Sequence, residues 1–121
     1  MSKLIGLLKK KPGMSREEFE NYYETRHAPL AVRITAMGHD YRRNYVRKMR
    51  SAGVEVDALP PFDVITEVWI RDSLAYESFA ASMRDAVIRD QIVADEERFL
   101  DRAASQIFVV EEHASPRSGE N

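Results

Sequence analysis

Three sets of side chains in this 121-residue chain have the types and spacing that proton-transfer chemistry requires. His27 follows Tyr23 by four residues and Phe19 by eight, so a helix would place it on or beside its apolar face. An imidazole gives or takes a proton near neutral pH. We therefore treat His27 as a candidate catalytic residue; the alternative is a histidine that only pins the end of the helix by hydrogen bonds.

Glu67 is the second candidate catalytic residue. In a strand it shares one face with Ile65 and Trp69, which are both apolar. A buried carboxylate has to be paired, protonated or at a cavity, and desolvation raises the pKa of such a group toward the range of a useful acid or base. We predict that Glu67 points away from the helices, near Trp69 and within reach of a Tyr, His or Arg. A salt bridge to Arg43 or Arg47 is the structural alternative.

The acidic run at residues 95–97 is the third set. Ile92 and Phe99 have to face inward on their helix, and Asp95 shares that face because it lies three residues from one and four from the other. Asp95 is therefore the candidate catalytic carboxylate of the run. A solvated acidic surface is the alternative interpretation.

Aromatic side chains near these groups predict a pocket for a small ligand. Buried tyrosine hydroxyls need hydrogen-bond partners, so such a pocket would have a partly polar lining. An ordinary aromatic core would show the same spacing. The candidate substrate-binding residues are Tyr23, Tyr45, Trp69 and Phe99, and Tyr22 and Tyr41 belong to the same aromatic set.

No metal site and no cofactor are predicted. His39 and His113 complete the histidines, but no HxH, HxxxH or HExxH spacing occurs, and the chain has no cysteine. Glycine motifs that bind phosphates are also absent from the sequence. The net charge of −2 argues against a nucleic-acid partner, and no apolar run reaches the roughly 20 residues of a membrane span. We expect a cytoplasmic protein.

The elements that would position these residues follow from apolar periodicity and turn signals. Ser15 and Glu18 have the spacing of a capping box at the start of a helix, which Pro29 should kink or end. That region closes at Gly38, and residues 51–61 are predicted to be a loop. Strands are predicted at residues 3–9, 41–47, 62–70 and 106–112, and further helices over 73–83 and 85–103.

The predicted order β-α-β-β-α-β is that of a ferredoxin-like α+β domain, with both helices on one face of a four-stranded antiparallel sheet. Residues 1–113 would form this single domain, and the small and polar residues 114–121 would be a disordered tail. The other face of the sheet needs a cover. A second copy of the chain would supply it and would turn the two sheets into a dimeric α/β barrel.

Several segments resemble the EthD family. They are residues 3–19 (KLIGLLKKKPGMSREEF), 22–31 (YYETRHAPLA), 61–63 with 66–69, 95–101 and 110–113. The resemblance implies a ferredoxin-like fold that forms a dimeric α/β barrel, and it places His27 within a family motif. The family takes its name from a gene cluster for ether degradation that involves an oxidative system, and fungal members resemble dehydratases of polyketide pathways.

We therefore expect a small enzyme that needs no cofactor. It would act on an aromatic or polyketide-like molecule by proton transfer, with dehydration or isomerisation as the outcome. His27 would be the base or acid, and Glu67 or Asp95 its partner. Two alternatives remain: an oxidative role, either cofactor-free oxygenation or support of an oxidative degradation system, and a binding protein that uses the same cavity without catalysis.

Overall fold

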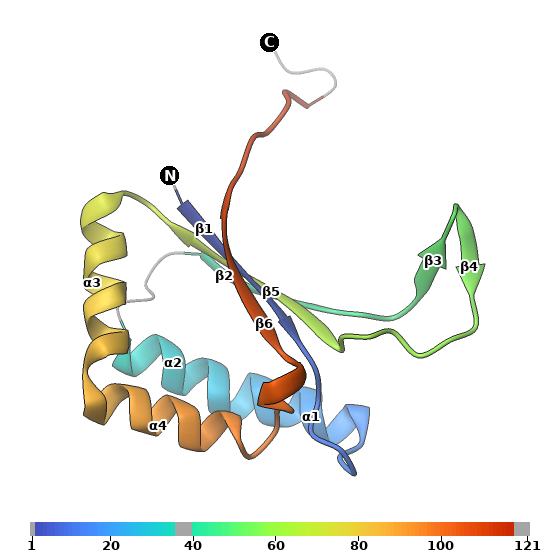
Figure 1. Ribbon diagram of the computed structural model, residues 1–121, viewed down its shortest axis with the longest axis horizontal. Coiled ribbons are helices and arrows are strands. Elements are labelled where there is room, and N and C mark those ends of the chain that lie inside the picture. Colours follow the sequence, from blue (N-terminus) through green and yellow to red (C-terminus); the bar gives the residue numbers. More distant parts are fainter. Residues whose placement is uncertain (1, 36–39, 118–121) are drawn as a thin grey trace.

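The computed structural model describes residues 2–35 and 40–117, and it shows a four-stranded antiparallel sheet with helices on one face (Figure 1). The strand order β2-β5-β1-β6 is the ferredoxin-like arrangement predicted from the sequence, so the fold class is confirmed. The four strands are β1 (Ser2–Leu8), β2 (Asp40–Tyr45), β5 (Val64–Ile70) and β6 (Gln106–Glu111).

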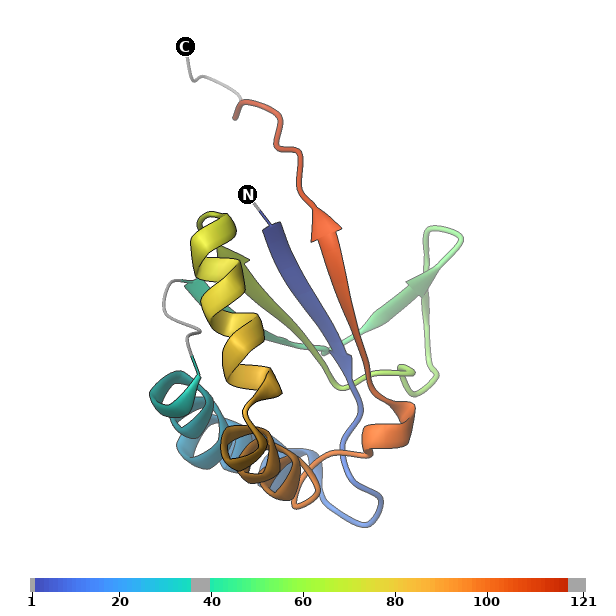
Figure 2. The ribbon, with the colours of Figure 1, turned by 60° about the vertical axis from the view of Figure 1, so that its left-hand side comes forward.

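The helices pack against one face of this sheet and leave the other face open (Figure 2). The helical segments are α1 (Arg16–Tyr22), the π-helical turn η1 (Tyr23–His27), α2 (Ala28–Ile34), α3 (Ser73–Arg84), α4 (Ala86–Glu96) and the 3₁₀ turn η2 (Arg102–Ala104).

The first helical region begins as predicted. The Ser15 side chain accepts a hydrogen bond from the Glu18 amide, and the Glu18 carboxylate accepts one from the Ser15 amide. Pro29 does not end the helix. The chain widens into η1 just before the proline and continues as α2, with Pro29 in its first turn, where its missing N–H is tolerated.

Strand β5 has the predicted alternation of faces. Val64, Thr66, Val68 and Ile70 are all buried on the side that the helices cover. Ile65, Glu67 and Trp69 lie on the open side of the sheet. The register of β1 against β5 pairs Leu8 with Val64 and Leu4 with Val68, so the apolar side chains of the two central strands share the covered face.

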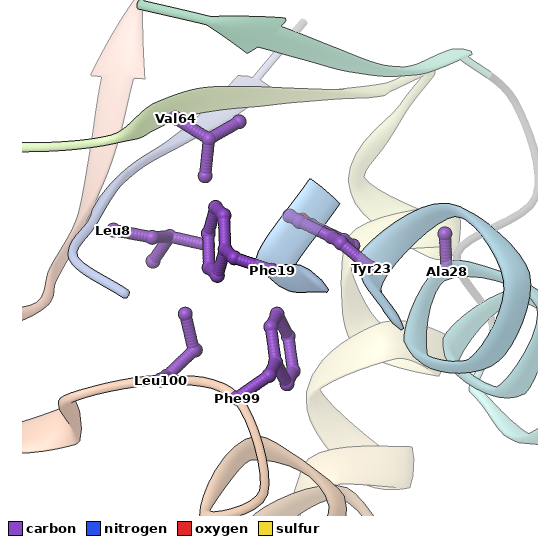
Figure 3. Close-up of a cluster of buried hydrophobic side chains, with 7 residues drawn as sticks. All are labelled: Leu8, Phe19, Tyr23, Ala28, Val64, Phe99 and Leu100. Atoms are coloured by element: carbon purple, nitrogen blue, oxygen red, sulfur yellow. The ribbon is translucent and has the colours of Figure 1, made fainter. Parts of the chain in front are cut away.

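The core is an aromatic cluster between the sheet and the first helix (Figure 3). Phe19, Val64 and Phe99 have no exposed surface, and Tyr23 has only 2%. The Phe99 ring lies 5.7 Å from the Phe19 ring and 5.2 Å from the Tyr23 ring, measured between centroids. Burying one such side chain stabilises the fold by about 1.5–3 kcal/mol. This cluster therefore fixes α1 and η1 against the sheet.

Two sequence predictions of secondary structure were wrong. The last long helix ends at Glu96 rather than near residue 103, because the following backbone pairs with the segment after β1: the Lys11 amide donates to the Phe99 carbonyl, and the Asp101 amide to the Lys9 carbonyl. The predicted loop at 51–61 contains part of a hairpin, formed by β3 (Met49–Ser51) and β4 (Val54–Val56), which projects from the domain (Figure 1).

Two further expectations have no structural outcome. Gly38, expected to close the first helical region, and His39 lie outside the described residues. The division into a domain at residues 1–113 and a disordered tail at 114–121 stays a prediction.

Candidate active site

A cavity of about 260 Å³ lies between the covered face of the sheet and the helices. Its floor comes from the four strands of the sheet, and its walls come from η1, α2, α3 and α4. Gly6 lies in the floor, where a Cβ atom would stand 2.5 Å from Thr66 Oγ1, so the close approach of the two strands requires glycine. The lining is mainly apolar; its polar members are Tyr23, His27, Thr35, Tyr41, Thr66 and Glu96.

His27 and Asp95 form a buried pair beside this cavity. Nδ1 of His27 lies 2.8 Å from Oδ2 of Asp95, and the two residues are 5% and 8% exposed. The Tyr22 hydroxyl donates a hydrogen bond of 2.6 Å to the other carboxylate oxygen, Oδ1. Burial and this contact raise the pKa of Tyr22, so its hydroxyl stays protonated.

The tautomer of the His27 ring follows from this arrangement. An ionised carboxylate only accepts hydrogen bonds, so Nδ1 carries the proton in the neutral ring and Nε2 carries the lone pair. No described residue forms a hydrogen bond with Nε2, and no fully buried side-chain nitrogen or oxygen in the described ranges lacks a partner. Nε2 is therefore accessible, and His27 lines the cavity. The pair can accept a proton from a ligand held there.

Tyr23 and Tyr41 supply two further hydroxyl groups, which lie 2.5 Å apart. Both residues line the cavity. Burial raises the pKa of Tyr41 to about 12, and it raises the pKa of Tyr23 well above its ordinary value. Both hydroxyls therefore keep their protons near neutral pH. One of the two hydroxyl protons forms the hydrogen bond between Tyr23 and Tyr41. The other hydroxyl proton can be donated to an oxygen of a ligand.

Glu67 lies on the opposite face of the sheet from this cavity. Its carboxylate forms an ion pair of 2.5 Å with Lys3, which is itself buried, and accepts a hydrogen bond of 2.9 Å from Asn44. Trp69 lies beside the same lysine, with Lys3 Nζ 4.1 Å from the ring centroid. The predicted orientation of Glu67 away from the helices is correct. Arg42 is paired with Glu67 in the register of β2 against β5, but its guanidinium hydrogen-bonds to Asp40, so the direct partner of Glu67 is Lys3 on the other neighbouring strand.

The structure brings together four of the seven predicted site residues. His27, Asp95, Tyr23 and Phe99 meet under the helices, where the Phe99 ring packs 4.8 Å from the His27 ring without lining the cavity itself. Glu67 and Trp69 lie across the sheet, and the Tyr45 hydroxyl turns away to donate a hydrogen bond to Glu24. Glu67 therefore cannot be the proton-transfer partner of His27 within one chain.

Sequence reasoning missed three contacts that shape the site. Tyr22 and Tyr41 were in the predicted aromatic set, but the partners Asp95 and Tyr23 were not foreseen. Lys3 was not considered at all. Its signal was available, since a lysine next to an apolar run in a predicted strand has to find an acidic partner if that strand is central and the lysine is buried.

Arg43 and Arg47, the alternative salt-bridge partners considered for Glu67, bind the first helical region instead. Arg43 makes two hydrogen bonds to Glu24, and Arg47 makes two to Glu20. The Arg43 contact, supported by the hydrogen bond from Tyr45, holds the pKa of Glu24 below its ordinary value of 4.5. Both arginine pairs connect the first helix to the end of β2 and the residues after it.

This lowered pKa predicts a pH dependence of stability. Because the folded-state pKa lies below the unfolded one, the Glu24 contribution is complete above pH 4.5 and is lost as the pH falls below that value. We expect Glu24→Gln to cost about 1 kcal/mol or less near pH 7, since the pair is partly exposed, and to cost less near pH 3 than near pH 7. Urea unfolding across that range measures the difference.

Glu77→Gln is the matched control for this prediction, because Glu77 is exposed in α3 and forms no ion pair with any described residue. A Glu24→Gln protein that lost as much stability at pH 3 as at pH 7 would contradict the prediction.

The strand order and the one-sided helix layer define a ferredoxin-like α+β protein with a buried His–Asp pair at a cavity. The family model described as EthD domain matches residues 11–103, so the chain belongs to the EthD family, and the resemblance seen in the sequence is confirmed. A comparison with curated proteins found no match.

Solved structures share this fold at low sequence identity. An ethyl tert-butyl ether D (EthD) family protein from Bacillus halodurans C-125 is 22% identical, with a TM-score of 0.62 over 93% of this chain and 99% of that one. An EthD-like protein from Ralstonia eutropha JMP134 is 19% identical, with a TM-score of 0.65 over 98% of this chain and 96% of that one. HapK from Hahella chejuensis is 13% identical, with a TM-score of 0.61 over 99% of this chain and 100% of that one.

The described ranges contain no candidate metal centre and no candidate membrane-spanning helix. No group of three or more His, Asp or Glu side chains is arranged there to hold a metal ion. No helix in the same ranges combines the length and the apolar character needed to cross a bilayer.

Proposed function

We propose that this protein is a cofactor-independent enzyme that transfers a proton within a small aromatic or polyketide-like molecule and so eliminates water or isomerises it. The observation that carries the proposal is the buried His27–Asp95 pair, whose remaining nitrogen, Nε2, is accessible at a mainly apolar cavity. Apolar walls with a few polar groups are typical of small-molecule sites. Positioned proton transfer is chemistry that these side chains can supply alone.

The elimination can be written for a β-hydroxy carbonyl compound. Nε2 of His27 removes the proton from the carbon next to the carbonyl group, and the electron pair of that C–H bond forms the C=C bond. The C–O bond to the β-hydroxyl breaks, and the imidazolium returns the proton to the leaving oxygen as water. Asp95 stabilises the transient imidazolium, and a hydroxyl of the Tyr23–Tyr41 pair can donate to the carbonyl oxygen as negative charge develops there.

A substrate screen tests this proposal against its rivals. The purified protein is incubated with a panel of β-hydroxy ketones and phenols, with mass spectrometry and an oxygen electrode as readouts. Loss of one water, or an isomer of unchanged mass, supports proton transfer. Oxygen consumption would replace the proposal with cofactor-free oxygenation. Recovery of one panel member bound but unaltered would replace it with a binding role.

We also propose that two copies of the chain associate through the open face of the sheet. Phe108 and Ile65 lie on this face with 45% and 37% of their surface exposed, and their strands flank β1. At one end of the same face, Lys3 forms ion pairs with both Glu67 and Glu112 and so offsets part of their negative charge. A second sheet packed here would bury this apolar surface and complete the predicted α/β barrel.

We expect the protein to sediment as a dimer at micromolar concentration and Phe108→Asp to sediment as a monomer, because the new carboxylate would be desolvated in the interface. Val87→Asp is the control, since Val87 is 68% exposed on α4, away from the sheet. Trp69, the only tryptophan, lies on the open face, so its emission should shift to the red in the monomeric variant. A wild-type protein that sediments as a compact monomer would contradict the proposal.

A further inference from the structure

A second hollow lies on the side of the first helix that faces away from the sheet. It is a groove of about 650 Å³ between the α1–η1–α2 region and the end of α4. It shares Asp95 with the His27 pair but none of the cavity-lining residues. The residues that line it are Asn21, Tyr22, Thr25, Arg26, Pro29, Leu30, Arg33, Asp95 and Arg98.

The groove concentrates positive charge in a chain whose net charge is −2. Three exposed arginines, Arg26, Arg33 and Arg98, line it together with one carboxylate, that of Asp95. Their charges therefore sum to +2 (three minus one). Such a local excess attracts anions.

These three arginines also differ from most others in the described part of the chain. None of them lies within 4.0 Å of a described carboxylate, whereas eight other arginines each form such an ion pair. Arg26 in η1 and Arg33 in α2 thus present guanidinium groups that form no ion pair with any described residue, and Arg98 joins them from the segment after α4.

Asp95 explains why the arginines stay unpaired. One carboxylate oxygen accepts the hydrogen bond from Tyr22, and the other accepts the one from His27. Both oxygens are therefore engaged from the protein interior, and the residue is 8% exposed. The hydrogen-bonding contact with the Tyr22 side chain, followed by the charge of Asp95, raises the pKa of Arg98, but Arg98 makes no ion pair there. The Asp95 carboxylate therefore forms no ion pair with Arg26 or Arg33, and their guanidinium donors can bind an external anion.

We propose that this groove is a second ligand site, which binds a small oxyanion such as a phosphate or carboxylate group. The planar guanidinium group matches both kinds of oxyanion through paired N–H donors. Leu30 and Pro29 give one wall of the groove an apolar surface that can hold the carbon skeleton of such a ligand. The proposal does not depend on the proposed function, because binding here needs no chemistry at His27.

The test is calorimetric titration with inorganic phosphate and, separately, with succinate, at constant ionic strength maintained with sodium chloride. We expect saturable binding with a Kd of about 1 mM or tighter for at least one of the two anions. The double variant Arg26→Gln/Arg33→Gln should weaken it about tenfold or more. Saturable binding of phosphate alone would show that the groove prefers a phosphate group. Saturable binding of succinate alone would show a preference for a carboxylate group, and binding of both would show a general oxyanion site.

Arg84→Gln is the matched control, because Arg84 is an exposed arginine of α3 outside the groove and without an ion pair to any described residue. Circular dichroism checks that all variants keep the fold, which the exposure of the substituted side chains leads us to expect. The proposal is overturned if the wild-type protein shows no saturable binding of either anion at millimolar concentration, or if Arg84→Gln loses as much affinity as the double variant.

Discussion

Replacing His27 with glutamine should lower the turnover number of the substrate identified by the screen by about 10²–10⁴-fold, the usual contribution of a positioned acid or base. Glutamine keeps the polarity and approximate size of the side chain but cannot carry the proton. Asp95→Asn should cause a smaller loss, because the imidazole remains while the charge that orients it and stabilises its protonated form is removed. Steady-state kinetics on folded protein, verified by circular dichroism, measures both effects.

Two further variants make this prediction specific. His113→Gln removes an exposed histidine that pairs only with Glu111 at the surface, and it should leave turnover unchanged. Glu67→Gln decides between the two faces of the sheet, because Glu67 lies opposite the cavity. If Glu67→Gln abolished turnover while His27→Gln did not, the catalytic site would be on the open face and the present assignment would be wrong.

Truncation of Phe99 to alanine should cost about 3–5 kcal/mol of folding free energy, as is typical for a phenylalanine removed from a close-packed core. Phe99 has no exposed surface and contacts Phe19, Tyr22, Tyr23 and His27 through its ring. The cavity left behind would adjoin the His27 ring, so the His27–Asp95 geometry should loosen as well. Urea denaturation followed by circular dichroism measures the loss.

Leu59→Ala is the matched control for this truncation, because Leu59 is 94% exposed and its removal should change the stability by no more than about 0.5 kcal/mol. A loss of less than 1 kcal/mol in Phe99→Ala would show that the aromatic cluster is not the core that holds the first helix. Phe99→Leu, which keeps most of the buried volume, should lose more stability than Leu59→Ala and less than Phe99→Ala.

Local signals made most of the fold predictable. The Ser15–Glu18 capping box is a contact between near neighbours, so the sequence alone contains both partners. The alternation in β5 is equally local, and it correctly separated the Val64–Thr66–Val68 face from the Glu67 face. Asp95 could be placed near the core because Ile92 and Phe99 shared its face in the predicted helix, and Asp95 and Ile92 are both buried in α4.

The elements that escaped prediction depend on distant or unusual backbone contacts. The hairpin β3–β4 turns through Ala52 and Gly53, both at positive φ, and alanine is not a residue that normally marks such a turn. The end of α4 depends on hydrogen bonds from the chain around Lys11, which no periodicity encodes. The choice of Asp95 rather than Glu67 as the partner of His27 depends on where the His27 side chain lies relative to the sheet, and the periodicity of its own helix does not decide that.

The His27–Asp95 pair forms within one chain, because η1 and α4 of the same copy supply its two residues. This has a genetic consequence if the chain functions as a dimer. An allele with His27 altered and an allele with Asp95 altered should fail to complement each other, since no mixed dimer assembles an intact pair from two damaged copies. Conversely, an inactive allele should not be dominant, because the wild-type copy in a mixed dimer keeps its own intact pair.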